Sequence, residues 1–341
     1  MLNVCKTLVD TAAWAASSSK QISLPNEGAI TRIMITAPFT VTACLAADTN
    51  TALHAWKPFQ SIKIEGGGGK AYFSMTGEQM GRMLHFVNLV DFPGRKFERG
   101  MATNTLYACL VLHFGSRPRD VYGRDNPYDL SAFIPAKDET NLKLTIETTQ
   151  AADICDTAID ISAGTFTAHV FEVLGLPDMK GMIPISSTES YAHTANKSDL
   201  SAQFNIPCGS FLRRIAIISQ DDTAISSGGP LMAADEISKA GIILPKENRR
   251  LIELDYEALV GKLALPGELL TTAAGAVTKP IITRQEGFLL LDFREFGNKD
   301  YGLDLRGYQN GDALLGLTIT NYASGDDTII WYDTIQPYKL G

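Results

Sequence analysis

The sequence contains few of the residues from which disulfide frameworks and structural metal sites are built. Its five cysteines are scattered, with no paired spacing and an odd total: Cys5, Cys44, Cys109, Cys155 and Cys208. A disulfide framework or a zinc knuckle needs closely spaced, patterned pairs. We therefore expect reduced thiols in a chain that folds in a cytoplasm, with Cys109 in a core strand.

Catalytic patterns are also missing. The five histidines are dispersed, with no HExxH pair for zinc and no GxSxG elbow for a serine nucleophile. Two acidic pairs, Asp221-Asp222 and Asp326-Asp327, lie in turns and could hold calcium, but neither has the alternating oxygen-ligand spacing of a dedicated loop. Solvated turn carboxylates are the favoured interpretation. The sequence thus predicts no catalytic, cofactor-binding or metal-ligating residues, and a protein that is not an enzyme.

The chain has no long apolar run and no excess of positive charge. No stretch approaches the roughly 20 residues that span a bilayer, and the N-terminus does not resemble a secretion signal. The net charge is −8, whereas nucleic-acid-binding proteins usually carry a basic excess. Arginines in the loops 91–105 and 115–125 are interleaved with carboxylates, which favours protein–protein salt bridges. We expect no sequence-specific binding of nucleic acid.

What the sequence does contain is a long echo. The stretch Gln21–Ile35, QISLPNEGAITRIMI, returns half a chain later as Gln203–Ile217, QFNIPCGSFLRRIAI. Each copy has an alternating strand, a break from Pro to Gly and a second alternating strand, because Pro cannot donate to a ladder and Gly supplies a turn. The pattern predicts one hairpin in each half. Most matched residues are 182 positions apart, while the glycines are one residue out of step: Gln21/Gln203, Pro25/Pro207, Arg32/Arg214, Ile33/Ile215 and Ile35/Ile217, but Gly28/Gly209.

Further echoes follow in the same order along both halves. They comprise two apolar strands, an Asp-Leu pair and the last strand of each half: Leu110–Phe114 with Leu289–Phe293, Asp129-Leu130 with Asp304-Leu305, Leu142–Ile146 with Leu315–Ile319, and Thr165–Val173 with Thr328–Ile335. One such match is expected by chance among generic strands, but four in order are not. At 341 residues the chain also fits two domains of about 150 residues each. We infer an internal duplication.

Short strands separated by turn signals predict an all-β chain with a few short helices. The glycines of Gly66–Lys70 are interpreted as a hairpin turn, because the segment lacks the remaining residues of a phosphate-binding loop. We expect a helix or arm over 1–19, although a frayed terminus fits this segment as well, and a linker over 176–200. Three further helices are predicted: Thr76–Asn88, Ala233–Ala240 and a segment around Tyr256–Lys262.

The repeated strand, the Leu24-Pro25 turn with Gly28, the Ile33-x-Ile35 beat and the later LVLHFGSRPRD segment resemble the major capsid proteins of double jelly-roll viruses. This is the adenovirus and tectivirus lineage of tailless icosahedral viruses. The resemblance implies two eight-stranded jelly rolls, over 20–175 and 201–341, and a homotrimeric, pseudo-hexameric capsomer in the virion. It also implies contacts with penton and minor capsid proteins and usually an internal membrane. The family has no catalytic residues to carry over.

Two other classes of function remain open. One is a tandem β-sandwich binding module, such as a lectin or a viral receptor-binding spike. The other is a glycosidase that uses paired carboxylates. Either would concentrate aromatic residues on a sugar-binding face, whereas Trp14, Trp56 and Trp331 fall in different elements.

Overall fold

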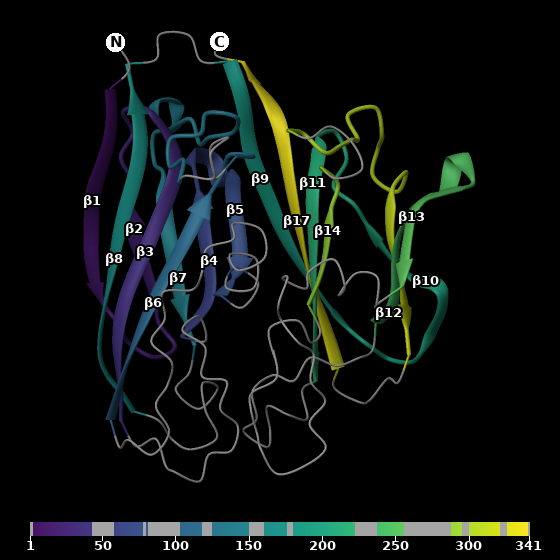
Figure 1. The fold of residues 1–341 in the computed structure, drawn as a ribbon, viewed down its shortest axis with the longest axis horizontal. Coiled ribbons are helices and arrows are strands. Elements are labelled where there is room, and N and C mark those ends of the chain that lie inside the picture. The colour runs from purple at the N-terminus through teal and green to yellow at the C-terminus, as the bar shows by residue number, and fades with distance from the viewer. Residues whose placement is uncertain are drawn as a thin grey trace.

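The computed structural model describes residues 3–42, 58–77, 80, 103–117, 125–149, 160–175, 180–221, 237–255, 288–294, 300–320 and 326–339. Its described elements are strands and three single-turn 3-10 helices, η1 (Gly67–Gly69), η2 (Ala136–Asp138) and η4 (Pro245–Glu247), and Gly77 and Met80 are α-helical. The all-β prediction is confirmed. Most strands run up and down in Figure 1, across the longest axis of the molecule, and both termini lie at the top.

The first half is a jelly roll of eight strands in two four-stranded sheets. Sheet I has the order β1-β8-β3-β6 and sheet II the order β2-β7-β4-β5. Their apolar faces enclose the core, as expected for a sandwich of two antiparallel sheets. The strands are β1 (Asn3–Ala13), β2 (Ser19–Ser23), β3 (Ala29–Thr42), β4 (Phe59–Glu65), β5 (Ala71–Thr76), β6 (Thr103–His113), β7 (Lys143–Thr148) and β8 (Asp160–Leu174).

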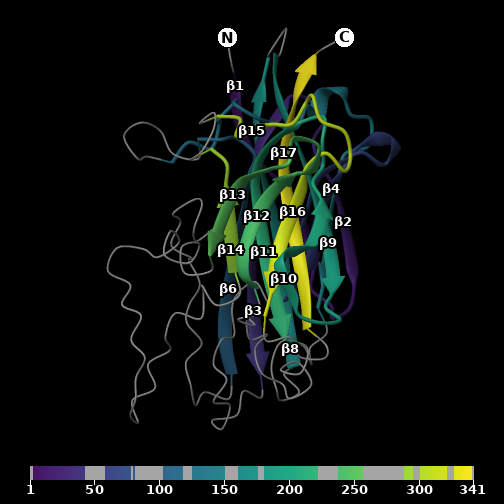
Figure 2. The same ribbon diagram turned by 90° about the vertical axis from the view of Figure 1, so that its right-hand side faces the viewer.

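The second half repeats this plan. Sheet III has the order β9-β17-β11-β14, with the two-residue β15 also pairing with β11, and sheet IV has the order β10-β16-β12-β13. In Figure 2 the view from the right-hand side brings this half toward the reader. The strands are β9 (Lys180–Ala192), β10 (Lys197–Asn205), β11 (Phe211–Asp221), β12 (Ile237–Leu244), β13 (Arg249–Asp255), β14 (Phe288–Asp292), β15 (Leu303–Asp304), β16 (Leu314–Ile319) and β17 (Asp326–Lys339).

The sheet orders confirm the duplication strand by strand. The predicted echoes fall on equivalent strands: β6 with β14, β7 with β16, and β8 with β17. Even an irregularity is repeated, since β3 bulges between Ile30 and Arg32 where it pairs with β8, and β11 bulges between Leu212 and Arg214 where it pairs with β17. A bulge in the same place of both halves identifies Thr31 and Arg213 as equivalent positions.

The opening echo is not a hairpin, and that prediction was wrong. Strand β2 belongs to sheet II and β3 to sheet I, while β10 belongs to sheet IV and β11 to sheet III. The Pro-to-Gly break therefore carries the chain across the sandwich from one sheet to the other. Local sequence predicts that two strands and a turn are present, but it does not say which sheet each strand joins.

Three further expectations are corrected. Residues 1–19, expected as a helix or arm, contain β1, which pairs with β8 and satisfies its backbone groups at the edge of sheet I. The expected linker over 176–200 contains β9 and the start of β10, so the first jelly roll ends at Leu174 and the second begins at Lys180. The expected helix at Ala233–Ala240 overlaps β12.

The other local predictions have mixed outcomes. The glycine-rich turn is confirmed, since η1 lies between the paired strands β4 and β5. Thr76 ends β5, and Gly77 and Met80 are helical as predicted, while the rest of the helix expected at Thr76–Asn88 lies outside the described residues, as does the segment around Tyr256–Lys262. None of the helices within the described ranges is long and apolar enough to cross a membrane.

Candidate functional site at the junction of the two jelly rolls

The cores of the two halves are not separate. The core of the first jelly roll also contains residues from sheet III of the second: Ile183, Ala216, Ile218, Leu290 and Trp331. Trp331 is 2% exposed, and its indole ring lies 6.3 Å from the ring of Phe73 on β5, centroid to centroid. Phe73 in turn lies 6.2 Å from Phe114, at the end of β6. The open edge of the first sandwich is thus closed by the outward face of the second.

A polar seam runs beside this apolar contact, where β5 lies next to β9 (Figure 1). The backbone N–H of Ser74 donates to Ser186 Oγ over 2.8 Å, and Thr188 Oγ1 donates to the carbonyl oxygen of Ser74 over 3.1 Å. These bonds give the unpaired edge of β5 hydrogen-bond partners without extending the sheet. They also fix the register between the two halves.

Two adjacent arginines of β11 bind one buried carboxylate at the junction. Arg213 Nη2 lies 2.7 Å from Asp333 Oδ1, and Arg214 Nη2 lies 2.6 Å from Asp333 Oδ2, with all three side chains at most 7% exposed. Arg213 also donates from Nη1 to the carbonyl oxygen of Phe114 in the first half, over 2.7 Å. One ionic cluster therefore links β11 and β17 within sheet III and also binds the first jelly roll through Phe114.

Burial and charge act in opposite directions in this cluster. Burial disfavours the ionised Asp333, but the two guanidinium groups outweigh it and hold the pKa of the carboxyl below its usual value. Burial lowers the pKa of Arg214 to about 10, which still leaves it charged at neutral pH. Removing one partner of such a cluster leaves an uncompensated buried charge, so the cluster fixes one geometry of the junction.

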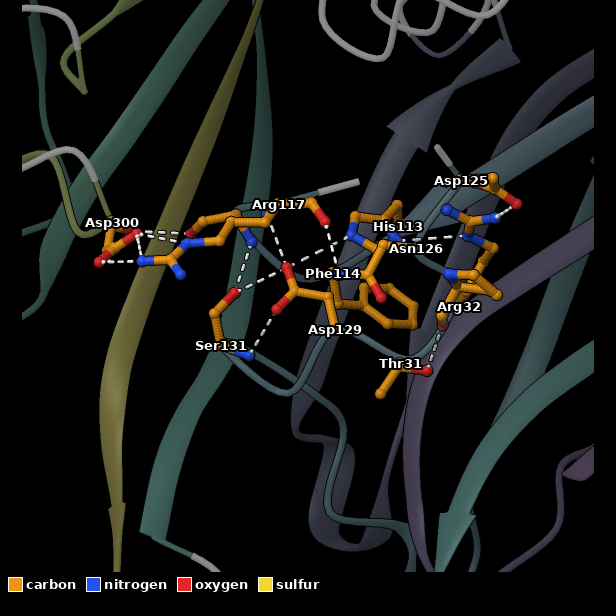
Figure 3. Close-up of polar contacts among 12 residues, drawn as sticks. Thr31, Arg32, His113, Phe114, Arg117, Asp125, Asn126, Asp129, Ser131 and Asp300 are labelled. Atoms are coloured by element: carbon orange, nitrogen blue, oxygen red, sulfur yellow. Dashed lines mark hydrogen bonds and ion pairs between the residues drawn. The ribbon is translucent and has the colours of Figure 1, made fainter. Parts of the chain in front are cut away.

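The segment after β6 makes further contacts across the junction (Figure 3). Arg117 forms a bidentate ion pair with Asp300 of the second half, Nη2 lying 2.8 Å from Oδ1 and from Oδ2. Ser116 Oγ donates to the backbone carbonyl of Asp300 over 2.7 Å, and Arg294 Nη1 donates to the carbonyl of Ser116 over 3.2 Å. The ionic Arg117–Asp300 contact is exposed, unlike the cluster at Asp333.

His113 is buried behind this segment. Its Nδ1 accepts a hydrogen bond from Arg32 Nε over 3.3 Å, and its Nε2 lies 3.6 Å from Asp129 Oδ2. Burial lowers the pKa of His113, and the neighbouring Arg32 and Arg213 act in the same direction. Asp129 also accepts backbone N–H groups from Arg117 and Ser131, and with His113 these bonds outweigh burial and lower its pKa. A neutral histidine between an arginine and a carboxylate stabilises the start of the junction segment.

The arrangement of these residues is suited to holding the two jelly rolls together. Within the described ranges, no group of three or more His, Cys, Asp or Glu side chains is placed to hold a metal ion. The two acidic turns of the sequence are brought together in backbone register, with Asp221 opposite Asp326 and Gln220 opposite Asp327, while Asp222 lies outside the described residues. Cys5, Cys109 and Cys208 are free thiols, and Cys109 lies in β6 as expected but is only partly buried.

Sequence reasoning missed this site. The available signal was the pair Arg213-Arg214 inside the apolar strand FLRRIAII, because charged residues are almost never buried without a partner. The partner, Asp333, lies on β17 and could not be found from spacing. Asp129-Leu130 and Asp304-Leu305, noted as an echo, make the same local turn in both halves, each carboxylate accepting from the backbone two residues on.

No protein-family model matches the sequence, and no curated protein matches it significantly. The fold does match solved structures. The crystal structure of the STIV MCP has a TM-score of 0.71 at 15% identity, covering 98% of this chain and 96% of that chain. The atomic structure of Sulfolobus Turreted Icosahedral Virus gives 0.70 at 15% identity, covering 98% and 90%. The major capsid protein P2 from bacteriophage PM2 gives 0.55 at 11% identity, covering 100% and 99%.

These matches span both jelly rolls and the junction between them, and they cover the solved capsid chains nearly from end to end. Sequence identities of 11–15% carry the fold alone. The chain has the double jelly-roll fold of viral major capsid proteins.

Proposed function

We propose that the protein is the major capsid protein of an icosahedral virus and that it acts as a structural building block. The observation that supports this most is the full-length match in both directions to the STIV MCP, at 98% and 96% coverage. A match of this kind requires two jelly rolls in the same relative placement, not merely two sandwiches in one chain. Here the packing of Trp331 in the first core, the bonds between β5 and β9 and the bond from Arg213 to Phe114 hold that placement.

We further propose that three copies form a capsomer with six related jelly rolls, a pseudo-hexagonal block that tiles a shell. In such an assembly the function lies in the contacts between copies, so the protein needs no catalytic residues. Contacts with penton and minor capsid proteins, and an underlying membrane, belong to the same proposal. The location is the virion, after synthesis in the host cytoplasm.

The alternative of a sugar-binding module or glycosidase has less support. Trp331 is buried in the core of the first jelly roll and Trp14 packs partly buried against it, so the two do not form a shared open face for a sugar. Trp56 lies outside the described residues.

Light scattering coupled to size exclusion tests the proposal on the purified full-length chain. We expect a particle three times the mass of the 37.0 kDa chain, stable on dilution, because interfaces between such subunits exceed the roughly 1,600 Å² of a standard complex. Negative-stain microscopy should show particles of hexagonal outline. A monomer at every concentration would contradict the proposal.

A further inference from the structure

Among the described residues, the large hydrophobic side chains that remain exposed gather on a single strand. Val4 and Leu8 are each 57% exposed, and both lie on β1. This strand of 11 residues forms an edge of sheet I, and among the described strands it pairs in the sheet with β8 alone. A long edge strand that shows apolar side chains is a template for association, and proteins normally cover or charge it.

The second jelly roll shows what covers the equivalent strand. In the first jelly roll, Leu8 of β1 and Met34 of β3 both pair with His169. In the second, Thr188 of β9 and Ala216 of β11 both pair with Trp331. Met34 and Ala216 are equivalent positions of β3 and β11. Leu8 therefore occupies the position of Thr188. By the same registers Lys6 occupies the position of Ser186, and Val4 that of Pro184.

These equivalent positions differ in burial for one reason. Ser186 is 4% exposed and hydrogen-bonded to Ser74, because β5 of the first jelly roll lies against β9. Nothing within the chain's described residues plays the part of β5 for β1. The outer face of β1 in the first jelly roll is thus exposed and more apolar, whereas the equivalent face of β9 in the second is buried.

The complementary edge is also uncovered. Strand β13 of the second jelly roll is the counterpart of β5, since both are the last strands of their sheets, beside β12 and β4. Lys63 of β4 and Lys239 of β12 pair with equivalent threonines, so the two lysines are equivalent. The residues that pair with them on the edge strands, Ser74 of β5 and Asp255 of β13, are therefore equivalent too. By the same register Leu254 is equivalent to Phe73. Leu251 and Leu254 pack only partly buried against the second core.

We propose that the outer face of sheet I around Val4 and Leu8 is the docking surface for the β13 edge of a second copy of this chain. The contact repeats between chains the seam that β5 and β9 make within one chain, and it rests on the function proposed above. In Figure 1 sheet I and β13 lie on opposite sides of the molecule, so each copy offers one surface to each neighbour. Such a head-to-tail contact generates a ring when its rotation closes.

The charges at the seam match. In the chain, Ser74 of β5 contacts Ser186 of β9. The corresponding pair between copies is Asp255 of β13 and Lys6 of β1, which are both exposed. Within the chain Asp255 lies 3.8 Å from Lys239 and is still 69% exposed, so it can also meet a second ammonium group. Leu254 would then lie toward the positions of His169 and Leu8, as Phe73 lies toward Trp331. A serine–serine contact within the chain is replaced by an ion pair between chains.

The test replaces Leu8 with Asp in the full-length protein. A buried carboxylate at the centre of an interface should weaken association by about 30-fold or more, so the trimer should dissociate at concentrations where the wild type stays intact. Because Leu8 is exposed in the single chain, the circular dichroism spectrum should stay that of the wild type. Ser201→Asp, at an exposed position of β10 on the other edge of sheet IV, is the matched control and should leave the trimer intact.

A charge exchange tests the register. Lys6→Asp and Asp255→Lys should each weaken the trimer, and the double variant should restore it. If the wild type is a trimer and the Leu8→Asp variant is an equally stable trimer, the docking surface is wrong but the capsid proposal stands. A monomeric wild type would overturn the capsid proposal itself. A double variant weaker than both single variants would overturn the pairing of Lys6 with Asp255.

Discussion

The two jelly rolls share the order of eight strands in their sheets but treat equivalent outward positions differently. In the second, Arg214 and Asp333 are paired on β11 and β17 and buried by the first jelly roll. In the first, the equivalent pair is Arg32 and Phe171, and the guanidinium lies over the ring, 5.8 Å from its centroid. The carboxylate that Arg32 binds is instead the exposed Asp125.

The difference separates two kinds of residue. Inward positions repeat as apolar residues in both halves, such as Ile33 and Ile215, because each sandwich must fill its own core. Outward positions follow whatever neighbour lies beyond the sheet. Trp331 and His169 are equivalent in register, yet Trp331 is buried against the other half while His169 is only partly covered. One fold therefore gives two halves with different roles.

The largest expected effect comes from breaking the cluster that only the second half has. Asp333→Asn removes the one carboxylate that Arg213 and Arg214 both contact, which should lower the free energy of unfolding by about 3–5 kcal/mol. Urea denaturation at neutral pH measures the loss. Asp304→Asn, which breaks an exposed pair with Arg306 in the same half, is the matched control and should have little effect. Equal losses in the two variants would contradict the distinction.

Much of the fold could be predicted from the sequence because inward positions carry the signal. The alternation of apolar residues marked most strands, and its recurrence marked the duplication. Strand β1 was missed because it lies at an edge, where Val4, Lys6 and Leu8 all face outward and no apolar alternation remains to distinguish strand from helix. The linker interpretation failed for β9 for a related reason, since polar residues such as Ser186 and Thr188 meet the other half there.

The junction was not predictable, because it is made by contacts between residues far apart in the chain. Arg213 and Asp333 are 120 positions apart, and Ser74 and Ser186 are 112 apart. The sequence shows that an arginine pair lies in an apolar strand, but not what neutralises it. Sheet membership is lost in the same way, since a turn such as 24–28 is compatible with a hairpin or with a crossing between sheets.

The two glycines that are out of step in the sequence, Gly28 and Gly209, are confined by different causes. A Cβ on Gly28 would lie 2.3 Å from the backbone oxygen of Val173, so Gly28→Ala should cost about 1–3 kcal/mol through overpacking. Gly209 has open space around it but a φ of +85°, so Gly209→Ala should cost about 1 kcal/mol through backbone strain. Thermal and urea unfolding of both variants provide the measurement.

Asparagine separates the two causes. Gly209→Asn should be tolerated better than Gly209→Ala, because Asn adopts left-handed backbone more readily. Gly28→Asn should be worse than Gly28→Ala, because it adds atoms where there is no room. If Asn were better tolerated than Ala at both positions, or worse at both, the same cause would confine the two glycines. Their displacement in the sequence would then have no structural cause.

The smallest effect is a difference in how the halves respond to acid. His113 pairs with Arg32 in sheet I, and the equivalent residue beside Arg214 in sheet III is Asp292. The groups facing His113 are Arg32, Arg213 and Asp129, and burial together with the two arginines lowers its pKa. Below the ordinary histidine value the unfolded chain therefore takes up a proton that the folded chain resists, so stability falls as the pH drops from 7 toward 5.

The slope cannot exceed about 1.4 kcal/mol per pH unit for one group, and His113→Asn should flatten it over this range. Asp292 and Asp333 also lose stability in acid, but in a lower pH range. Burial opposes their ionisation, but the neighbouring arginines outweigh it and lower both pKa values, so their contribution persists through this range and is lost only as the pH falls below the ordinary value of a carboxyl group. Urea unfolding at pH 7, 6 and 5 should thus show a decline in the wild type that His113→Asn reduces and Asp333→Asn leaves unchanged in slope. If the stability of His113→Asn declined as steeply as that of the wild type, the acid-sensitive group would lie elsewhere. Sheets I and III would then differ in their charged residues at this position but not in their response to acid.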